Sequence, residues 1–275
     1  MSAIPTIDLG GDVTIPQLGF GVFQIPDDDT ERAVLQAFEL GYRHIDTAAI
    51  YRNERGVGRA LEASGLARED VFVTTKLWND AQGREHAPRA LADSLERLGL
   101  DWVDLYLIHW PVPKAGRYVE TWEALLELQQ EGLTRAVGVS NFQVSHLEAI
   151  IEATGVSPSI NQVELHPWLA QAQLRAFHAE ARIATEAWSP LAQGGDFLSD
   201  PTLSEIALAH GKSVAQVILR WHVQLGNVVI PKSATPSRIA ENAALFDFEL
   251  SAADLDAIAA LDRGERIGPD PDRFG

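Results

Sequence analysis

The chain alternates short apolar segments with amphipathic helical segments along almost its whole length. The apolar segments are rich in valine, isoleucine and leucine, as expected for strands that are buried on both faces of a parallel sheet. Each one is followed by a segment with the three-to-four-residue apolar spacing of a surface helix. There are eight strand candidates, which are residues 18–21, 43–47, 71–77, 103–109, 134–140, 159–165, 183–190 and 227–232.

Eight strand–helix repeats predict one kind of α/β fold, the (β/α)8 or TIM barrel, rather than an open sheet. No change in composition and no flexible linker divides the 275 residues, so we expect a single barrel domain over residues 1–275. Before the first repeat, residues 6–15 (TIDLGGDVTI) alternate apolar and polar side chains around Gly10-Gly11, which predicts an N-terminal β-hairpin. We expect this hairpin to plug the bottom of the barrel.

The main alternative, a doubly wound nucleotide-binding fold, lacks its phosphate-binding motif in this chain. That fold carries G-x-G-x-x-G between its first strand and helix. The nearest candidate, Gly56-Val57-Gly58, lies inside a predicted helix and has Leu61 where the third glycine belongs. The P-loop pattern is also missing from the sequence. The sequence therefore favours the barrel.

Charge and cysteine content exclude several classes of function. The chain has 39 acidic and 22 basic side chains and a formal net charge of -17, which argues against nucleic acid or an anionic membrane as a partner. The absence of cysteine excludes disulfides, thiolate metal sites and cysteine nucleophiles, and it fits a cytoplasmic protein. No apolar run reaches the roughly 20 residues of a membrane span, and we expect no secretory signal. An anionic ligand would need a local basic cluster.

Polar and aromatic side chains stand where the strand candidates end. In a (β/α)8 barrel these carboxyl-terminal ends meet on one face, which is the face that carries chemistry. Tyr51 follows Asp46 by five positions, at the start of the next predicted helix, so its hydroxyl can reach back over the same mouth. The strand-end residues are Asp46, Lys76, His109, Ser140, Asn141, Gln162, Trp188 and Lys232.

The titratable residues among these also have ordinary structural interpretations. Asp46 is typical of a turn or a helix cap, and a lone His109 is typical of a hydrogen-bonded core histidine. Lys76 is harder to explain in this way, because it directly follows a buried strand and an unpaired buried charge is unfavourable. The placement of these three residues and Tyr51 on one predicted rim favours a shared catalytic role.

The four side chains have chemistries that fit together. A phenol with its ordinary pKa near ~10 is a poor acid at neutral pH, but a nearby ammonium stabilises the phenolate and lowers that pKa. A carboxylate in turn keeps the ammonium charged. Asp46, Lys76 and Tyr51 therefore predict a relay in which Tyr51 is the general acid toward a carbonyl oxygen. A neutral His109 would donate a second hydrogen bond, and a hydride donor would complete carbonyl reduction.

The motifs that contain these residues resemble those of the aldo-keto reductase family. GYRHIDTAAIY, TTKLW, DLYLIHWP, GVSNF, NQVELHP and IPKS stand in the family's order and at its spacing, from the N-terminal hairpin to about residue 262. The chain is most similar to the short bacterial members, including 2,5-diketo-D-gluconate reductases. The resemblance implies a monomeric (β/α)8 barrel that uses NADPH to reduce aldehydes, ketones or dicarbonyls. It implies a catalytic set of Asp46, Tyr51, Lys76 and His109.

The resemblance also implies where the nicotinamide binds. Ser140, Asn141 and Gln162 match the residues that hold its carboxamide group. Trp188 matches the position of an aromatic residue that stacks on the nicotinamide ring, where many members have tyrosine. A larger indole face should still stack. Ordinary packing inside the barrel is the alternative interpretation for Trp188.

A local basic cluster follows the last strand candidate. Lys232 and Arg238 flank a predicted helix N-terminus, capped by Thr235 or Ser237, where free backbone N–H groups also favour an anion. We assign this cluster to the 2′-phosphate that distinguishes NADPH from NADH. The remaining predicted cofactor contacts come from this helix and its preceding loop and from a loop over the pyrophosphate at 189–195. They are Ser189, Leu191, Gln193, Ser233, Glu241 and Asn242.

Aromatic side chains are expected to wall the substrate pocket. By resemblance these are Phe23, Trp78 and Trp110, together with Tyr51, and ordinary packing is the alternative for each. Residues 263–275 fall where the family has a variable substrate-facing loop. In this segment Asp270-Pro271-Asp272 stands where related chains often carry His-Pro-Asp. The short tail predicts a rather open pocket.

Two other functions remain open from the sequence. One is a metal-dependent hydrolase on the same barrel, although Lys76 would compete with the metal ion and we expect no metal. The other is a non-catalytic, NADPH-binding regulatory module, against which the intact catalytic set argues. The sequence does not define the physiological substrate beyond a small-molecule carbonyl compound. The potential metal ligands are Asp46, His109, Glu164 and His166.

Overall fold

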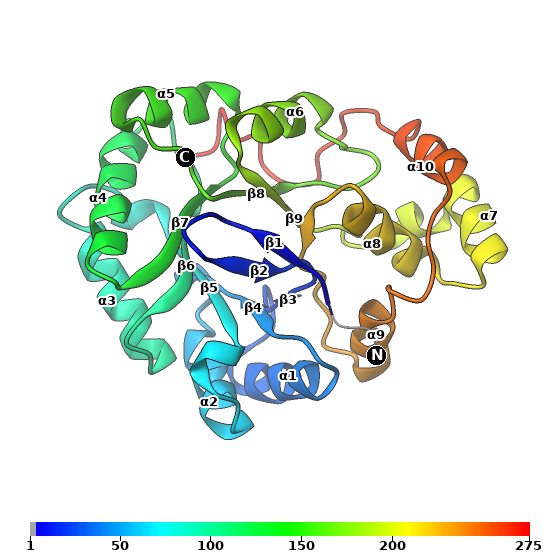
Figure 1. Ribbon diagram of the computed structural model, residues 1–275, viewed down its shortest axis with the longest axis horizontal. Coiled ribbons are helices and arrows are strands. Elements are labelled where there is room, and N and C mark those ends of the chain that lie inside the picture. Colours follow the sequence, from blue (N-terminus) through cyan, green and yellow to red (C-terminus); the bar gives the residue numbers. More distant parts are fainter. Residues whose placement is uncertain (1–3) are drawn as a thin grey trace.

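The computed structural model describes residues 4–275, and its main element is a parallel β-barrel (Figure 1). Eight parallel strands are hydrogen-bonded in the order β10-β9-β8-β7-β6-β5-β4-β3. Leu18 and Val229 form a parallel bridge, and the Gly19 N–H donates to the Val229 carbonyl at 2.9 Å, so the two ends of the sheet meet. The predicted barrel is therefore confirmed. Its strands are β3 (Phe20–Gly21), β4 (His44–Asp46), β5 (Phe72–Leu77), β6 (Val103–Ile108), β7 (Thr134–Ser140), β8 (Ile160–Glu164), β9 (Ala184–Trp188) and β10 (Val228–Val229).

The N-terminal hairpin covers the bottom of the barrel, as predicted from its sequence. Its two strands are β1 (Thr6–Asp8) and β2 (Thr14–Pro16), and Figure 1 shows them lying across the centre of the ring of strands. Buried apolar side chains of the hairpin form one cluster with barrel residues that include the first residues of β5, β8 and β10. Removing this apolar surface from water fixes the hairpin to the barrel. The cluster comprises Leu9, Val13, Ile15, Phe72, Leu105, Leu107, Ala136, Ile160 and Val228.

Helices surround the barrel and bury their apolar faces against the outside of the strands (Figure 1). Within the described residues, no helix has the length and hydropathy that crossing a bilayer requires. Short 3-10 turns, η1 (Ala49–Tyr51), η2 (Arg68–Asp70), η3 (Asn79–Ala81) and η4 (Gly195–Ser199), lie between the main elements. The helices are α1 (Asp27–Glu39), α2 (Glu54–Ser64), α3 (Ala87–Leu98), α4 (Tyr118–Gln130), α5 (Val144–Thr154), α6 (Ala172–Ala181), α7 (Pro201–His210), α8 (Val214–Gln224), α9 (Pro236–Ala243) and α10 (Ala252–Ala259).

Two local expectations from the sequence are wrong. The sequence predicts a helix from about Thr30 to Leu40 with Thr30 as its cap, but α1 begins at Asp27 and the Thr30 hydroxyl donates to the Pro26 carbonyl at 2.9 Å within the first turn. Tyr51 does not start α2. It is the last residue of the 3-10 turn η1, and α2 begins three residues later. This extra turn lies directly after β4, so Tyr51 still reaches the carboxyl end of the barrel.

Candidate active site

A cavity of about 560 Å³ lies at the carboxyl ends of the strands, opposite the hairpin. It collects side chains from β4, β8 and β9 and from the loops that follow most of the strands. Most of the residues predicted from the sequence meet here. They are Phe23, Asp46, Tyr51, Trp78, His109, Trp110, Ser140, Asn141, Gln162, Trp188, Ser189, Gln193 and Lys232.

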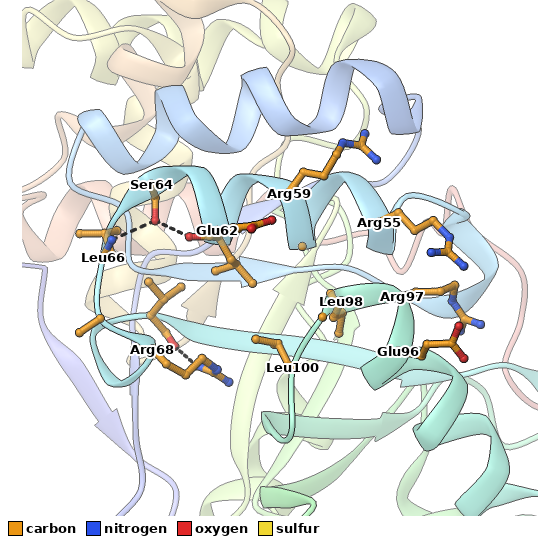
Figure 2. A pocket seen from close by; sticks show the side chains of 15 residues that line it. Arg55, Arg59, Glu62, Ser64, Leu66, Arg68, Glu96, Arg97, Leu98 and Leu100 are labelled. Carbon is orange, nitrogen blue, oxygen red and sulfur yellow. Dashed lines mark hydrogen bonds between the residues drawn. The ribbon is translucent and has the colours of Figure 1, made fainter.

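A second cavity of about 680 Å³ lies outside the barrel, between α2 and α3, and none of the predicted site residues lines it. Figure 2 shows arginines around it, including Arg59, Arg68 and Arg97. These three arginines are ion-paired with carboxylates. Because the predicted catalytic and cofactor residues meet at the barrel mouth and none of them lines the outer cavity, we take the cavity at the barrel mouth as the candidate site.

Lys76 and Asp46 form a buried ion pair at the base of this cavity. Lys76 Nζ donates to Asp46 Oδ1 at 2.6 Å, to Oδ2 at 2.8 Å and to the Thr47 carbonyl at 2.9 Å. Three acceptors satisfy the three N–H bonds of the ammonium group. Burial alone would lower the pKa of Lys76, but the charge of Asp46 opposes it and the net shift is upward. Lys76 is therefore charged at neutral pH.

Tyr51 places its ring beside this ion pair. Lys76 Nζ lies 5.1 Å from the centre of the phenol ring, and the Phe23 and His109 rings lie 5.0 and 5.6 Å away from it. Burial raises the pKa of Tyr51, while the positive charge of Lys76 lowers it, and the net shift is upward. The predicted lowering by the ammonium is present, but burial outweighs it. Tyr51 holds its proton at neutral pH.

His109, which follows β6, is neutral in this site. Burial and then the positive charge of Lys76 lower its pKa well below the ordinary histidine value. Its Nδ1 is buried and has no hydrogen-bond partner within residues 4–275. A proton on Nδ1 would bury a donor without an acceptor, which is unfavourable. The neutral ring therefore carries its proton on Nε2 and can donate it to an oxygen in the cavity.

A second buried carboxyl group, Glu186 on β9, was not predicted from the sequence. Gln162 Nε2 donates both to Asp46 Oδ2 at 2.7 Å and to Glu186 Oε2 at 2.9 Å, so the amide joins the two acids. Burial and the charge of Asp46 raise the pKa of Glu186 to about 8. Glu186 therefore carries a proton at neutral pH. An acidic residue two positions before Trp188, on the same face of a buried strand, is the signal in the sequence that could have revealed it.

The inner end of the cavity fits a carboxamide group. Trp188 Nε1 donates to Asn141 Oδ1 at 2.8 Å, and Asn141 Nδ2 donates to the His109 carbonyl at 2.9 Å. The Ser140 hydroxyl donates to the carbonyl of Gln162 at 2.8 Å. Because both N–H bonds of Gln162 point to carboxyl groups, its Oε1 remains an acceptor, and Asn141 Oδ1 has a second lone pair. A carboxamide NH2 needs acceptors of this kind.

The basic cluster lies at the other end of the site. Lys232 lines the cavity, whereas Arg238 is exposed on the first turn of α9. Neither has an ion-pair partner within residues 4–275. Thr235 is the N-cap residue of α9, but its side chain caps nothing, and Ser233 Oγ instead accepts the Thr235 N–H at 3.1 Å. The predicted residues that do not line the cavity are Lys76, which lies beneath it, and Leu191, Ser233, Arg238, Glu241 and Asn242.

The C-terminal tail, residues 263–275, forms part of the cavity wall, in agreement with the substrate-facing position that the family resemblance implies. Ile267, Gly268 and Phe274 line the cavity. The Phe274 ring lies 4.6 Å from Trp110, centre to centre. Asp272 Oδ1 lies 3.5 Å from His146 Nε2, on α5. The tail therefore narrows the mouth, although its short length led us to expect an open pocket.

Comparisons with known proteins identify the family of this chain. The family model described as the aldo/keto reductase family matches residues 17–263. An aldo-keto reductase of Mycolicibacterium smegmatis is 55% identical over 98% of both chains. The methylglyoxal reductase DkgA of Escherichia coli is 54% identical over 95% of this chain and 94% of its own. The crystal structure of a Gox0644 mutant in complex with NADPH has a TM-score of 0.95 and 47% identity, and both chains are fully covered.

The chain belongs to the aldo/keto reductase family. The predicted family and the predicted reaction class, carbonyl reduction by an oxidoreductase, are therefore confirmed. The predicted cofactor agrees with the NADPH in the Gox0644 complex. A metal-dependent hydrolase is not favoured, and within residues 4–275 no group of three or more histidine, cysteine or acidic side chains could hold a metal ion.

Proposed function

We propose that the protein reduces small, uncharged aldehydes and dicarbonyl compounds with NADPH, and that Tyr51 is the general acid. The observation that carries the proposal is the buried Lys76–Asp46 pair beside Tyr51 and His109 at the mouth of the barrel. When bound, NADPH supplies the hydride that the carbonyl carbon accepts. The chain's own residues have to orient the carbonyl oxygen and donate a proton to it.

Tyr51 suits the proton transfer because its phenol stays protonated until a carbonyl oxygen gains negative charge. Donation leaves a phenolate, which the nearby Lys76 ammonium stabilises. Asp46 keeps that ammonium charged and in place. His109 donates a second hydrogen bond from Nε2 to the same oxygen, which fixes its position as negative charge develops.

The walls of the cavity favour uncharged substrates. Asp46 and Lys232 are the only residues with an ordinarily charged side chain that line the cavity within residues 4–275. Asp46 is neutralised by Lys76, and Lys232 belongs to the proposed cofactor end. The carboxylate of an acidic substrate would therefore lie among aromatic rings without a cation, which is unfavourable.

The similar relatives support the same class of substrate. The DkgA proteins of Escherichia coli and Salmonella typhimurium, both 54% identical to this chain, are methylglyoxal reductases. Methylglyoxal is a small, uncharged dicarbonyl compound. Its aldehyde group is reactive, and the molecule is small enough for the cavity of about 560 Å³. We therefore include it among the proposed substrates.

The substrate class can be tested with a pair of aldehydes that have similar size and differ in charge. The rate of NADPH oxidation is measured with para-nitrobenzaldehyde, para-carboxybenzaldehyde and methylglyoxal. Because the nitro group also activates the aldehyde by withdrawing electrons, the ratio of the two kcat/KM values is divided by the ratio of their reduction rates with borohydride in solution. We expect this corrected ratio to favour the nitro compound at least about tenfold, since 1.4 kcal/mol of desolvation changes kcat/KM by that factor.

The possible results separate the parts of the proposal. Equal or better use of para-carboxybenzaldehyde would contradict the preference for uncharged substrates while leaving carbonyl reduction intact. Binding of NADPH without its oxidation by any of the three aldehydes would contradict the catalytic proposal and would favour the regulatory module.

The proposal also includes a single domain over residues 1–275, a monomeric state and a cytoplasmic location. The domain organisation is supported by the family match across residues 17–263. The resemblance to the family implies the monomer, and the lack of cysteine fits the cytoplasm. Sedimentation velocity and cell fractionation test the last two statements, and a dimer or a secreted protein would contradict them.

A further inference from the structure

Glu164, the last residue of β8, is a buried carboxylate that binds the backbone of the C-terminal tail. It is 1% exposed, and it accepts the Ile267 N–H on Oε1 at 2.6 Å and the Gly268 N–H on Oε2 at 3.0 Å. His166 Nε2 lies 3.0 Å from Oε1. Burial alone would raise the pKa of Glu164, but these hydrogen bonds hold it below its ordinary value. An ionised Glu164 therefore ties the tail to the barrel rim.

Gly268 brings the tail backbone into close contact with Trp188. A Cβ atom at position 268 would lie 2.5 Å from Trp188 Cη2 and 2.9 Å from Glu164 Oε2. No side chain can occupy that space unless the indole moves, because such separations are far inside van der Waals contact. The pyrrole ring of the same indole is fixed by the hydrogen bond from Nε1 to Asn141 Oδ1. Trp188 is therefore held at both its benzene ring and its pyrrole ring.

These contacts link the tail to the predicted nicotinamide-stacking residue. Glu164 and Trp188 are directly opposite each other in the pairing of β8 with β9, so their side chains start from neighbouring points of the rim. Trp188, Ile267 and Gly268 all line the cavity. The carboxylate, the tail backbone and the indole therefore form one packed unit at the predicted nicotinamide position.

We propose that Glu164 is a positioning residue for the cofactor. With the backbone of Ile267 and Gly268 it forms a tail clamp, defined by these three residues, that holds the Trp188 indole in the orientation that stacks on nicotinamide. This inference rests on the proposed function, because it requires NADPH to bind at Trp188. The tail clamp acts by pre-organisation: a ring that is already ordered loses less freedom when the cofactor binds.

Without Glu164, only contacts outside the tail clamp keep the tail in place. The anchors nearest to Ile267 and Gly268 would be the hydrogen bond from Arg266 to Gln171 at 3.4 Å and the Asp272–His146 pair at 3.5 Å. Between these two anchors the backbone would be free to leave the indole edge. Ordering it again on binding lowers the affinity for NADPH, and immobilising one or two side chains corresponds to a factor of about three to ten.

The test compares Glu164→Gln with Glu265→Gln. Both substitutions replace one carboxylate by an amide, but Glu265 is an exposed tail residue that pairs with Arg263 and is not part of the tail clamp. In Glu164→Gln an NH2 group faces a backbone N–H, so at least one of the two hydrogen bonds is lost. Two quantities are measured on the full chain: amide hydrogen exchange at residues 267 and 268 without cofactor, and the Kd for NADPH by fluorescence titration.

We expect Glu164→Gln to speed amide exchange at residues 267 and 268 at least about tenfold, because a hydrogen bond to a charged group is lost. Its Kd for NADPH should rise about three- to tenfold. Glu265→Gln should leave both quantities within about twofold of the parent, since it removes only an exposed ion pair. Amides of β5 serve as a control for the fold.

Gly268→Ala provides a second variant. It changes the tail and keeps the Glu164 carboxylate in the sequence. Its methyl group should displace the indole and raise the Kd for NADPH by a similar factor. If both substitutions act through the same contact, the Kd of the double variant for NADPH should equal the higher of the two single-variant Kd values. Additive losses would contradict a single tail clamp.

The outcomes distinguish this inference from the proposed function. A parent protein that does not bind NADPH would contradict both. If the parent binds NADPH but Glu164→Gln and Gly268→Ala match Glu265→Gln in affinity, the positioning role is overturned and the proposed function stands. Unchanged amide exchange at residues 267 and 268 in Glu164→Gln would also overturn the positioning role, whatever the affinity of this variant for NADPH.

Discussion

The ammonium of Lys76 and the carboxylate of Asp46 face each other inside the barrel, with Nζ at 2.6 and 2.8 Å from the two carboxylate oxygens. Lys76 is fully buried and Asp46 nearly so. A buried pair of this kind is stable only while both partners are present, because the remaining charge is otherwise left without compensation. The pair also supplies the positive charge beside Tyr51 on which the proposed proton transfer depends.

Replacing Lys76 by methionine should reduce both stability and activity. Methionine fills a similar volume but leaves Asp46 buried without its cation, so we expect a loss of about 3–5 kcal/mol in the free energy of unfolding. Carbonyl reduction should fall by at least about 100-fold, because the phenolate formed at Tyr51 is no longer stabilised. Urea unfolding and kcat/KM for an aldehyde measure the two effects.

A double substitution separates charge balance from catalysis. Adding Asp46→Asn to Lys76→Met removes the uncompensated carboxylate and should restore part of the lost stability. It should restore no activity, because the ammonium is still absent. A Lys76→Met variant with near-parental rates and an unchanged pH profile would rule out the role of Lys76 in tuning Tyr51.

Arg238→Ala tests the assignment of the basic cluster to the 2′-phosphate. A charge-assisted contact to a phosphate contributes roughly 1.5–3 kcal/mol, so loss of the guanidinium should weaken NADPH by about one to two powers of ten. NADH lacks this phosphate and should be much less affected. Fluorescence titration of both cofactors at one ionic strength gives the two affinities.

Arg84→Ala is the matched control for Arg238→Ala. Arg84 is also an exposed arginine, but it precedes α3 and pairs with Glu123 and Glu127 on α4, away from α9. Its loss removes the same charge from the protein. The affinities for NADPH and NADH should both change only slightly and by the same factor. Equal losses of NADPH and NADH in Arg238→Ala would show that Arg238 supports the fold or the adenine. A parent that prefers NADH would contradict the assignment of the whole cluster.

The stability of the fold should fall in acid because several histidines, including His109 in the active site, are buried in their neutral form. Burial lowers the pKa of His44 and His222 to about 3 and that of His178 to about 4, from an ordinary value of 6.5. Below pH 6.5 the unfolded chain therefore binds more protons than the folded chain. Each such histidine reduces the free energy of unfolding by up to about 1.4 kcal/mol per pH unit as the pH falls.

Glu186 should have the opposite effect, so that the free energy of unfolding decreases as the pH rises. Its pKa is raised by burial to about 8, from an ordinary value of 4.5, so the folded chain holds a proton that the unfolded chain releases. This contribution to stability is present below pH 4.5 and is lost as the pH rises toward 8. Because several histidines outweigh one carboxyl group below pH 6.5, we expect the parent to be most stable near that pH.

Urea unfolding of the parent and of Glu186→Gln between pH 4 and about pH 8.5 checks both slopes. Glu186→Gln should flatten the decline above pH 6.5 and should steepen the fall in stability from pH 6.5 to about pH 4.5, because the opposing contribution of the carboxyl group is gone. A parent that is more stable at pH 4.5 than at pH 6.5 would contradict the account of the histidines. The same alkaline decline in Glu186→Gln would contradict the account of the carboxyl group.

The sequence was sufficient for the parts of the site that barrel geometry determines. The carboxyl ends of parallel strands must converge, so Asp46 after β4, Lys76 near the end of β5 and His109 after β6 were predicted to meet, and they line or underlie one cavity. The β-hairpin was predicted from local alternation around two glycines. These features depend on periodicity and on the order of elements, which a sequence carries directly.

Other features depend on packing between distant segments, which no local pattern encodes. Glu186 becomes a partner of Asp46 only through Gln162. Phe274 lies against Trp110, 164 positions earlier by residue number, and the tail that carries it has no periodic pattern. The net direction of the Tyr51 pKa shift is of the same kind, because the burial that outweighs the ammonium is a property of the folded site.

The most direct test of the general-acid role of Tyr51 is kcat/KM for an aldehyde in Tyr51→Phe, measured together with the Kd for NADPH. The phenyl ring still fills its place between Phe23 and His109, but the proton donor is gone. We predict a Kd for NADPH within about twofold of the parent and a kcat/KM lower by about 100- to 10,000-fold. A kcat/KM within a few-fold of the parent, with NADPH still bound, would contradict the assignment of Tyr51 as the acid.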